Sequence, residues 1–151
     1  MAKIQRAPQS VHGAYEADYA AWLDNQAKLL RAGKVQAIDA DHLAEEIEDM
    51  GRSERRSLES HLKVLLQHLV KWHYQSERRG PSWRMSIDNA RDAIEDLLAG
   101  SPSLRPVLAK AVAQQYRRAR RDALQETGLA SAAVPQGCPF ALETILDSDL
   151  P

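Results

Sequence analysis

Apolar residues recur at three- and four-residue spacing through most of the chain, which is the spacing of one face of an α-helix. The first such series predicts a helix from about Tyr15 to Ala32 that ends at Gly33. Its face contains Tyr15, Tyr19, Trp22, Leu29 and Leu30, with Gln26 as the polar member. We expect this face to be buried.

A longer series predicts a helix over residues 41–74, which follows Asp39 or Asp41 as N-cap. Its apolar positions are Leu43, Ile47, Met50, Leu58, Leu62, Leu65, Leu69 and Trp72. At about 100° per residue the two halves of this series stay on roughly one face of a helix. Gly51 is therefore expected as a tolerated or kinked residue inside one long helix rather than as a break between two helices.

Two more helices are predicted after the sequence Gly80-Pro81-Ser82. The third helix ends at Gly100, and the fourth runs from near Ser103 to about Thr127 before Gly128. Because the linker between them is short, we expect these two helices to pack antiparallel. Their apolar positions are Trp83, Ile87, Ala90, Ile94 and Leu97 in the third helix and Leu104, Leu108, Val112, Ala119 and Ala123 in the fourth.

The end of the chain is predicted to form a loop over residues 129–138 and a short helix that Pro139 opens. Phe140, Leu142, Ile145 and Leu146 are the apolar positions of this short helix. The sequence therefore indicates an all-α protein, an antiparallel bundle of about four long helices plus a short C-terminal helix. Its predicted organisation is a polar N-terminal tail over residues 1–14 and a single helical-bundle domain over residues 15–151.

Composition agrees with this fold class. The chain of 151 residues has 23 Ala and 18 Leu but only 7 Val, 6 Ile and 2 Thr, so good helix formers far outnumber β-branched residues. The lone thiol of Cys138 excludes an internal disulfide. No apolar run has the length of a signal peptide core or a membrane span, and we expect a cytoplasmic protein.

Several sequence blocks resemble the bacterial family catalogued as domain of unknown function twenty-nine. The most specific is Leu43-Ala-Glu-Glu-Ile-Glu-Asp-Met-Gly-Arg-Ser-Glu-Arg56. The others are Tyr15-Glu-Ala-Asp-Tyr-Ala-Ala-Trp22, the stretch Leu65 to Tyr74, Ser82-Trp83-Arg84, Ser101-Pro102-Ser103-Leu104-Arg105 and Cys138-Pro139-Phe140. The resemblance spans nearly the whole chain and implies an all-helical, single-domain bacterial protein. It carries over no activity, substrate, cofactor or catalytic residue.

An acidic block lies near the start of the predicted long helix. Its candidate metal ligands are His42, Glu45, Glu46 and Asp49, with Glu48 beside them. Such a helix resembles those of all-helical nucleotide pyrophosphatases, and the third helix offers Asp88, Asp92, Glu95 and Asp96 as a second half. On a helical projection, however, most of these carboxylates lie opposite the apolar positions, and only Glu46 lies at the flank of the stripe. We therefore favour a solvated acidic face over a metal or phosphate site.

A second group of polar residues is spaced by seven: Glu54, His61 and His68. On a continuous helix they fall within or beside the apolar stripe, where polar groups need partners. Seven residues rise about 10.5 Å, so the two histidines cannot share one metal ion. We interpret them as a polar cluster at the edge of the core, with Gln26 and Gln115 as hydrogen-bond partners, and a pH-sensitive cluster is the alternative.

The third group is basic and consists of Arg117, Arg118, Arg120 and Arg121 near the end of the fourth helix. Arginines near aromatic residues suit nucleic acid, but these four are spread around the helix and the chain has a formal net charge of −1. We therefore do not expect nucleic acid as a partner. Ion pairs with acidic helix faces, or with a second subunit, are the interpretation we favour.

These observations leave the biochemical function open. The interpretation we favour is a small interaction or regulatory module that acts by binding a protein, including a second copy of itself as a dimer, without a cofactor and without a membrane. The alternatives are a metal-dependent nucleotide (pyro)phosphohydrolase of all-helical type and a nucleic-acid-binding protein. The hydrolase requires a pocket with inward-pointing carboxylates, whereas a binding module requires an exposed apolar or charged surface.

Overall fold

A computed structural model describes residues 11–147 and 149–150, with side chains from Ala14 onward. Over these residues the chain forms six α-helices joined by turns and short 3₁₀ segments, and no strand. The predicted all-α fold is therefore confirmed. Its longest helix, α3 (Ala40–Tyr74), continues through Gly51 as the sequence predicts. The chain divides into two compact units, Met1–Gly51 and Arg52–Pro151, and a single domain over residues 15–151 stays a prediction.

The N-terminal unit begins with two short helices, α1 (Val11–Ala17) and α2 (Tyr19–Arg31). The prediction of one helix across this stretch is wrong, because Asp18 adopts an extended backbone and caps α2: its Oδ1 accepts a hydrogen bond from the backbone N–H of Ala21 at 3.0 Å. α1 also includes the last part of the predicted polar tail, whereas residues 1–10 lie outside the described residues. Gly33 follows α2 at φ +68°, as the predicted helix end requires.

Burial in the N-terminal unit differs from the prediction. Trp22 and Gln26 are buried, but Tyr19 and Leu30 are 46% and 50% exposed. Ile47 and Met50, which were expected to be buried, are 67% and 69% exposed. The physical reason is size, since a unit of this length has few elements to cover each helix and leaves much of its apolar surface in water.

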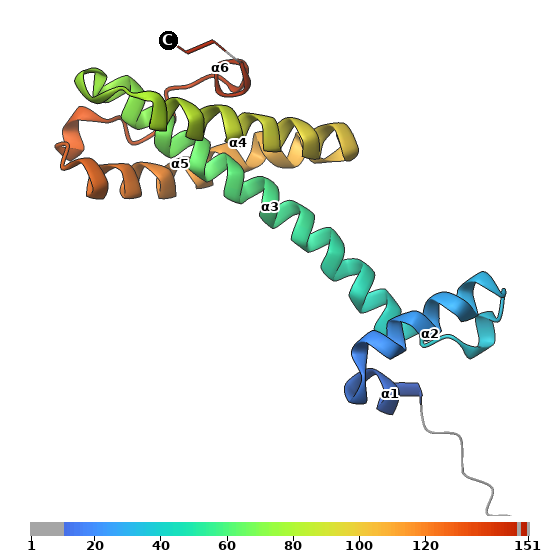
Figure 1. The fold of residues 1–151 in the computed structure, drawn as a ribbon. Helices are drawn as coiled ribbons and strands as arrows, with labels where there is room; N and C mark the ends of the chain where they lie inside the picture. Colours follow the sequence, from blue (N-terminus) through green and yellow to red (C-terminus); the bar gives the residue numbers. More distant parts are fainter. Residues whose placement is uncertain (1–10, 148, 151) are drawn as a thin grey trace, which may run out of the picture. The chain divides into compact units, whose positions relative to one another are not determined.

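The C-terminal unit is built on the second half of α3, α4 (Pro81–Gly100) and α5 (Arg105–Thr127). The predicted boundaries are confirmed: Pro81 opens α4, and Gly128 ends α5 in the left-handed conformation. Figure 1 shows α4 and α5 running in opposite directions, as the short linker requires. Their contacts form one hydrophobic core that includes Leu58, Leu62, Leu65, Leu66, Leu69, Ile87, Ile94, Leu108 and Tyr116.

The C-terminal segment after α5 packs against this core. It contains a 3₁₀ turn at Ser131–Ala133 and the short helix α6 (Leu142–Leu146), and it buries Val134 and Ile145. The prediction that Pro139 opens the last helix is wrong, because the backbone is still extended at Ala141 and the helix begins at Leu142. The Tyr116 hydroxyl donates a hydrogen bond to the Pro135 carbonyl at 2.8 Å and fixes the middle of the segment.

Candidate binding surfaces

A cluster of aromatic and acidic side chains joins α1, α2 and the start of α3 inside the N-terminal unit. The Tyr15 and His42 rings stack with their centroids 4.0 Å apart and an interplanar angle of 14°. The buried Asp39 carboxylate contacts His42 Nδ1 at 2.7 Å and accepts a hydrogen bond from Trp22 Nε1 at 3.2 Å. We call Tyr15, Tyr19, Trp22, Asp39, His42 and Glu46 the His42 cluster.

Hydrogen bonds control the protonation of the His42 cluster. The hydrogen bond with Asp39 raises the pKa of His42. Burial tends to raise the pKa of Asp39, but the hydrogen bonds from His42 and Trp22 outweigh it and lower that pKa below its ordinary value. These shifts in opposite directions favour a charged Asp39–His42 pair.

Glu46 links the same cluster to two tyrosines. The hydroxyls of Tyr15 and Tyr19 donate hydrogen bonds to the two carboxylate oxygens of Glu46 at 2.7 and 2.5 Å. These hydrogen bonds lower the pKa of Glu46, and the one from Tyr15 raises the pKa of that tyrosine to about 12. The side chain at the flank of the predicted apolar stripe thus holds α1 and α2 against α3.

The four candidate metal ligands do not converge on one site. His42 and Glu46 are engaged in the His42 cluster, whereas Glu45 and Asp49 are exposed, as are Glu48, Asp92, Glu95 and Asp96. Asp88 is partly exposed and pairs with Arg84 on its own helix. Among residues 14–147 and 149–150, no group of three or more His, Cys, Asp or Glu side chains is arranged to hold a metal ion.

The predicted polar cluster of α3 is also dispersed. Glu54 is exposed, contrary to the prediction, and His61 and His68 are half-buried. His68 Nδ1 lies 2.9 Å from the Val64 carbonyl of its own helix, and burial lowers the pKa of this histidine. The predicted partners are wrong: Gln26 accepts a hydrogen bond from the Asp39 backbone, and Gln115 Nε2 is buried without a partner in the described part of the chain.

The basic group of α5 divides into two parts. Arg120 is half-buried and donates hydrogen bonds to the Ser131 and Val134 carbonyls, so it holds the C-terminal segment. Arg117, Arg118 and Arg121 are exposed and, with Gln114, line a hollow of about 300 Å³. Of the four predicted arginines, these three form an exposed basic surface, on which Arg121 also pairs with Asp122 at 3.0 Å.

Ion pairs between α3 and α5 were missed by the sequence analysis. Lys63 Nζ lies 2.5 Å from Asp122, and Lys71 Nζ lies 2.6 Å from Glu126. Lys71 is buried and also lies over the Trp83 ring, 4.7 Å from its centroid. The aliphatic stem of a lysine can occupy a core position while its ammonium reaches a carboxylate, and no apolar periodicity reveals such a residue.

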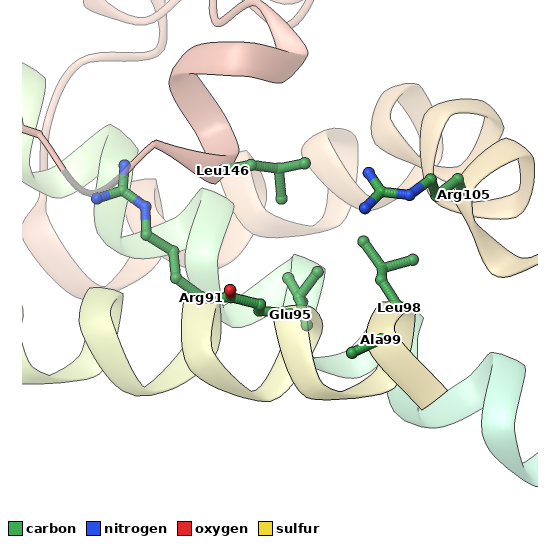
Figure 2. A pocket seen from close by; sticks show the side chains of 7 residues that line it. Arg91, Glu95, Leu98, Ala99, Arg105 and Leu146 are labelled. Carbon is green, nitrogen blue, oxygen red and sulfur yellow. The ribbon is translucent and has the colours of Figure 1, made fainter. Parts of the chain in front are cut away.

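A cavity of about 360 Å³ lies between α4, the start of α5 and α6. Figure 2 shows the Arg105 guanidinium pointing into this cavity and the Arg91 guanidinium turned toward the C-terminal segment. Arg91 is buried and donates hydrogen bonds to the Ile145 and Thr144 carbonyls, each at 3.0 Å. Arg91 therefore serves to hold α6 in place.

Two further surface features lie on the N-terminal unit. Large apolar side chains lie exposed on it: Tyr19, Leu23, Leu30, Val35, Ile47 and Met50. A separate cavity of about 420 Å³ is lined by small residues of α1 and α2, by Ala37 and by the buried pair Trp22 and Gln26.

The helices described above define the chain as an all-α protein. The family model described as domain of unknown function DUF29 matches residues 14–150. The chain belongs to this family. None of the curated proteins and none of the solved structures matches it. No helix in the described part of the chain is long and apolar enough to cross a membrane.

Proposed function

We propose that the protein is an interaction module that acts by binding, and that its partner is a second copy of the same chain. The observation that carries this proposal is the exposure of Ile47 and Met50, at 67% and 69%, on α3. Exposed apolar side chains that gather on one unit are typical of surfaces that bind proteins. Full burial of one such side chain contributes about 1.5–3 kcal/mol.

The distribution of charge supports a second copy as the partner. Residues 1–51 contain nine acidic and five basic side chains, whereas residues 52–151 contain twelve acidic and fifteen basic ones. The acidic unit of one copy is therefore complementary to the basic unit of another. On the acidic side Glu45, Glu48 and Asp49 are exposed, and on the basic side Arg117, Arg118 and Arg121 are exposed.

Charge pairing of this kind selects the partner more than it provides affinity. Each exposed ion pair contributes only about 0–1 kcal/mol and is weakened by salt. The exposed apolar side chains would supply most of the binding free energy. The proposal places this association in the cytoplasm, in agreement with the sequence-based expectation.

Sedimentation velocity over a range of protein concentrations tests the proposal. We expect a monomer–dimer equilibrium that shifts toward monomer when the salt concentration is raised and when Ile47 and Met50 are both replaced by Glu. The matched control replaces two exposed alanines of the same helix and unit, Ala40 and Ala44, by Glu, and should shift the equilibrium less. A protein that stays monomeric at all concentrations in low salt would overturn the proposal.

A further inference from the structure

The hollow of about 300 Å³ on α5 gathers three guanidinium groups. It is lined by Gln114, Arg117, Arg118 and Arg121, and we call it the arginine hollow. These positions are spaced by three and four residues, so their side chains are neighbours on one face of the helix. The three arginines are exposed, and among the residues that the structure describes no carboxylate lines the hollow. A ligand from solution can therefore reach all three guanidinium groups.

Ion pairs neutralise only part of the positive charge of the arginine hollow. The side chains of Arg117 and Arg118 make no hydrogen bond or ion pair in the described part of the chain. Arg121 Nε and Nη2 lie 3.0 Å from Asp122 Oδ1, but the other oxygen of that carboxylate lies 2.5 Å from Lys63 Nζ. Lys63 and the three arginines thus bring four positive charges against the one negative charge of Asp122. The excess positive charge is available to an anion.

The sequence around the arginine hollow is basic throughout. Between Asp96 and Asp122 the chain has six basic residues and no acidic one. Arg117 and Arg121 lie four positions apart on α5, and like charges at this spacing destabilise a helix. An anion bound between these side chains would remove the repulsion.

The lining of the arginine hollow favours a compact phosphate group. The N–H groups of a guanidinium form a planar fork that matches the oxygens of a phosphate, and three such forks match a group with several oxygens and several negative charges. The amide of Gln114 adds another N–H donor. Single-stranded nucleic acid also needs aromatic side chains on which its bases stack, and no aromatic residue of the described chain lines the hollow. The chemistry therefore favours a small polyphosphate over a nucleic acid strand.

We propose that the arginine hollow binds a diphosphate group, whose oxygens accept hydrogen bonds from Arg117, Arg118 and Arg121. The acidic unit of a second copy would use the same arginines, so a bound diphosphate competes with the proposed self-association. The diphosphate site itself does not depend on self-association, because all of its residues belong to one copy of α5.

Isothermal titration calorimetry of the full-length protein tests this site, in a chloride buffer without phosphate or sulfate. The probes are pyrophosphate, orthophosphate and oligothymidylate, which represents single-stranded nucleic acid. We expect saturable binding of one pyrophosphate per chain, several-fold tighter than the binding of orthophosphate or oligothymidylate. The titration is repeated with the Ile47→Glu/Met50→Glu variant, in which a second copy covers the arginines less. Calorimetry of this variant and sedimentation of the unmodified protein therefore distinguish failure of the diphosphate site from failure of self-association.

Two substitutions at Arg118 and a matched control locate the site. Arg118→Gln should weaken pyrophosphate binding about tenfold, because charge-assisted hydrogen bonds are lost. Arg118→Lys keeps the charge but lacks the fork, and should also weaken binding. The control Arg105→Gln removes the same group from an exposed position of α5 outside the hollow. Arg105 lies about 20 Å along the helix from Arg118, beyond the range of screened charges, so binding should change by less than about twofold.

Three results would overturn the proposal. The first is the absence of saturable pyrophosphate binding at millimolar concentration in the Ile47→Glu/Met50→Glu variant. The second is equal weakening by Arg118→Gln and Arg105→Gln, which would show that only the net charge matters. The third is tighter binding of oligothymidylate than of pyrophosphate, which would indicate a nucleic acid surface. Circular dichroism of each variant checks that the helices are retained.

Discussion

Replacement of Arg91 with Met is expected to release the C-terminal segment from the helical core. Arg91 is buried, and its two hydrogen bonds to the Ile145 and Thr144 carbonyls come from a charged group. Such bonds contribute about 1.5–3 kcal/mol each. Two effects offset part of this stabilisation. Burial disfavours the charged form of the guanidinium and so lowers the pKa of Arg91, and Nη1 has no hydrogen-bond partner among the described residues. We therefore expect a net loss of about 2–4 kcal/mol.

Urea unfolding followed by circular dichroism measures this loss, and hydrogen exchange locates it. The amides of residues 142–147 should exchange faster in Arg91→Met than in the unmodified protein. The control is Arg105→Met: Arg105 lines the same cavity (Figure 2), but it is exposed and its side chain makes no hydrogen bond or ion pair in the described part of the chain. Arg105→Met should change the free energy of unfolding by no more than about 0.5 kcal/mol. Equal losses in the two variants would refute the role of Arg91.

Two further predictions concern the core and the His42 cluster. Leu65→Ala should lower the free energy of unfolding in urea by about 2–5 kcal/mol, because Leu65 is a fully buried residue of α3. A decrease below about 1 kcal/mol would show that Leu65 does not pack in the core as described. The charged form of Asp39, whose pKa is lowered, stabilises the N-terminal unit, and this stabilisation is lost as the pH falls through that pKa. The charged form of His42, whose pKa is raised, also stabilises the unit, and this stabilisation is lost as the pH rises through the pKa of His42. The Asp39–His42 pair should therefore stabilise the N-terminal unit most strongly between about pH 4 and 6.5. Hydrogen exchange of the Trp22 indole N–H measures this stabilisation, with the indoles of Trp72 and Trp83 as internal controls. A His42 that titrates below about pH 6.5 would contradict the prediction.

The helices of the C-terminal unit were predictable because their apolar periodicity and their helix-end residues agree with the way the helices pack. The apolar period of α3 between Leu58 and Leu69 coincides with the buried face, and Pro81 and Gly128 mark helix ends by their own backbone preferences. The failure at Asp18 has a local cause as well. An aspartate can cap a helix or lie inside one, and the apolar spacing across residues 15–22 is the same in both cases.

The candidate sites were less predictable, because they depend on which helix faces are covered. Periodicity identified the apolar face that contains Ile47 and Met50 but could not show that the described residues of the unit leave both side chains exposed. Glu46 was recognised as the carboxylate at the flank of the stripe, but its tyrosine partners lie about 30 positions earlier in the chain, where no helical spacing connects them. The hydrogen bond that Gln26 accepts likewise becomes visible only once the backbone of Asp39 is placed beside it.

The central claim is that the acidic unit of one copy binds the basic unit of another, and a mixing experiment tests it most directly. One variant carries Glu45→Lys, Glu48→Lys and Asp49→Lys, and the other carries Arg117→Glu, Arg118→Glu and Arg121→Glu. Each variant alone should be monomeric in sedimentation velocity, because both of its units then carry charges of the same sign. An equimolar mixture should again form dimers, since each unit of one variant meets its complement in the other. Dimers that persist in either variant alone, or a mixture that stays monomeric, would contradict the account.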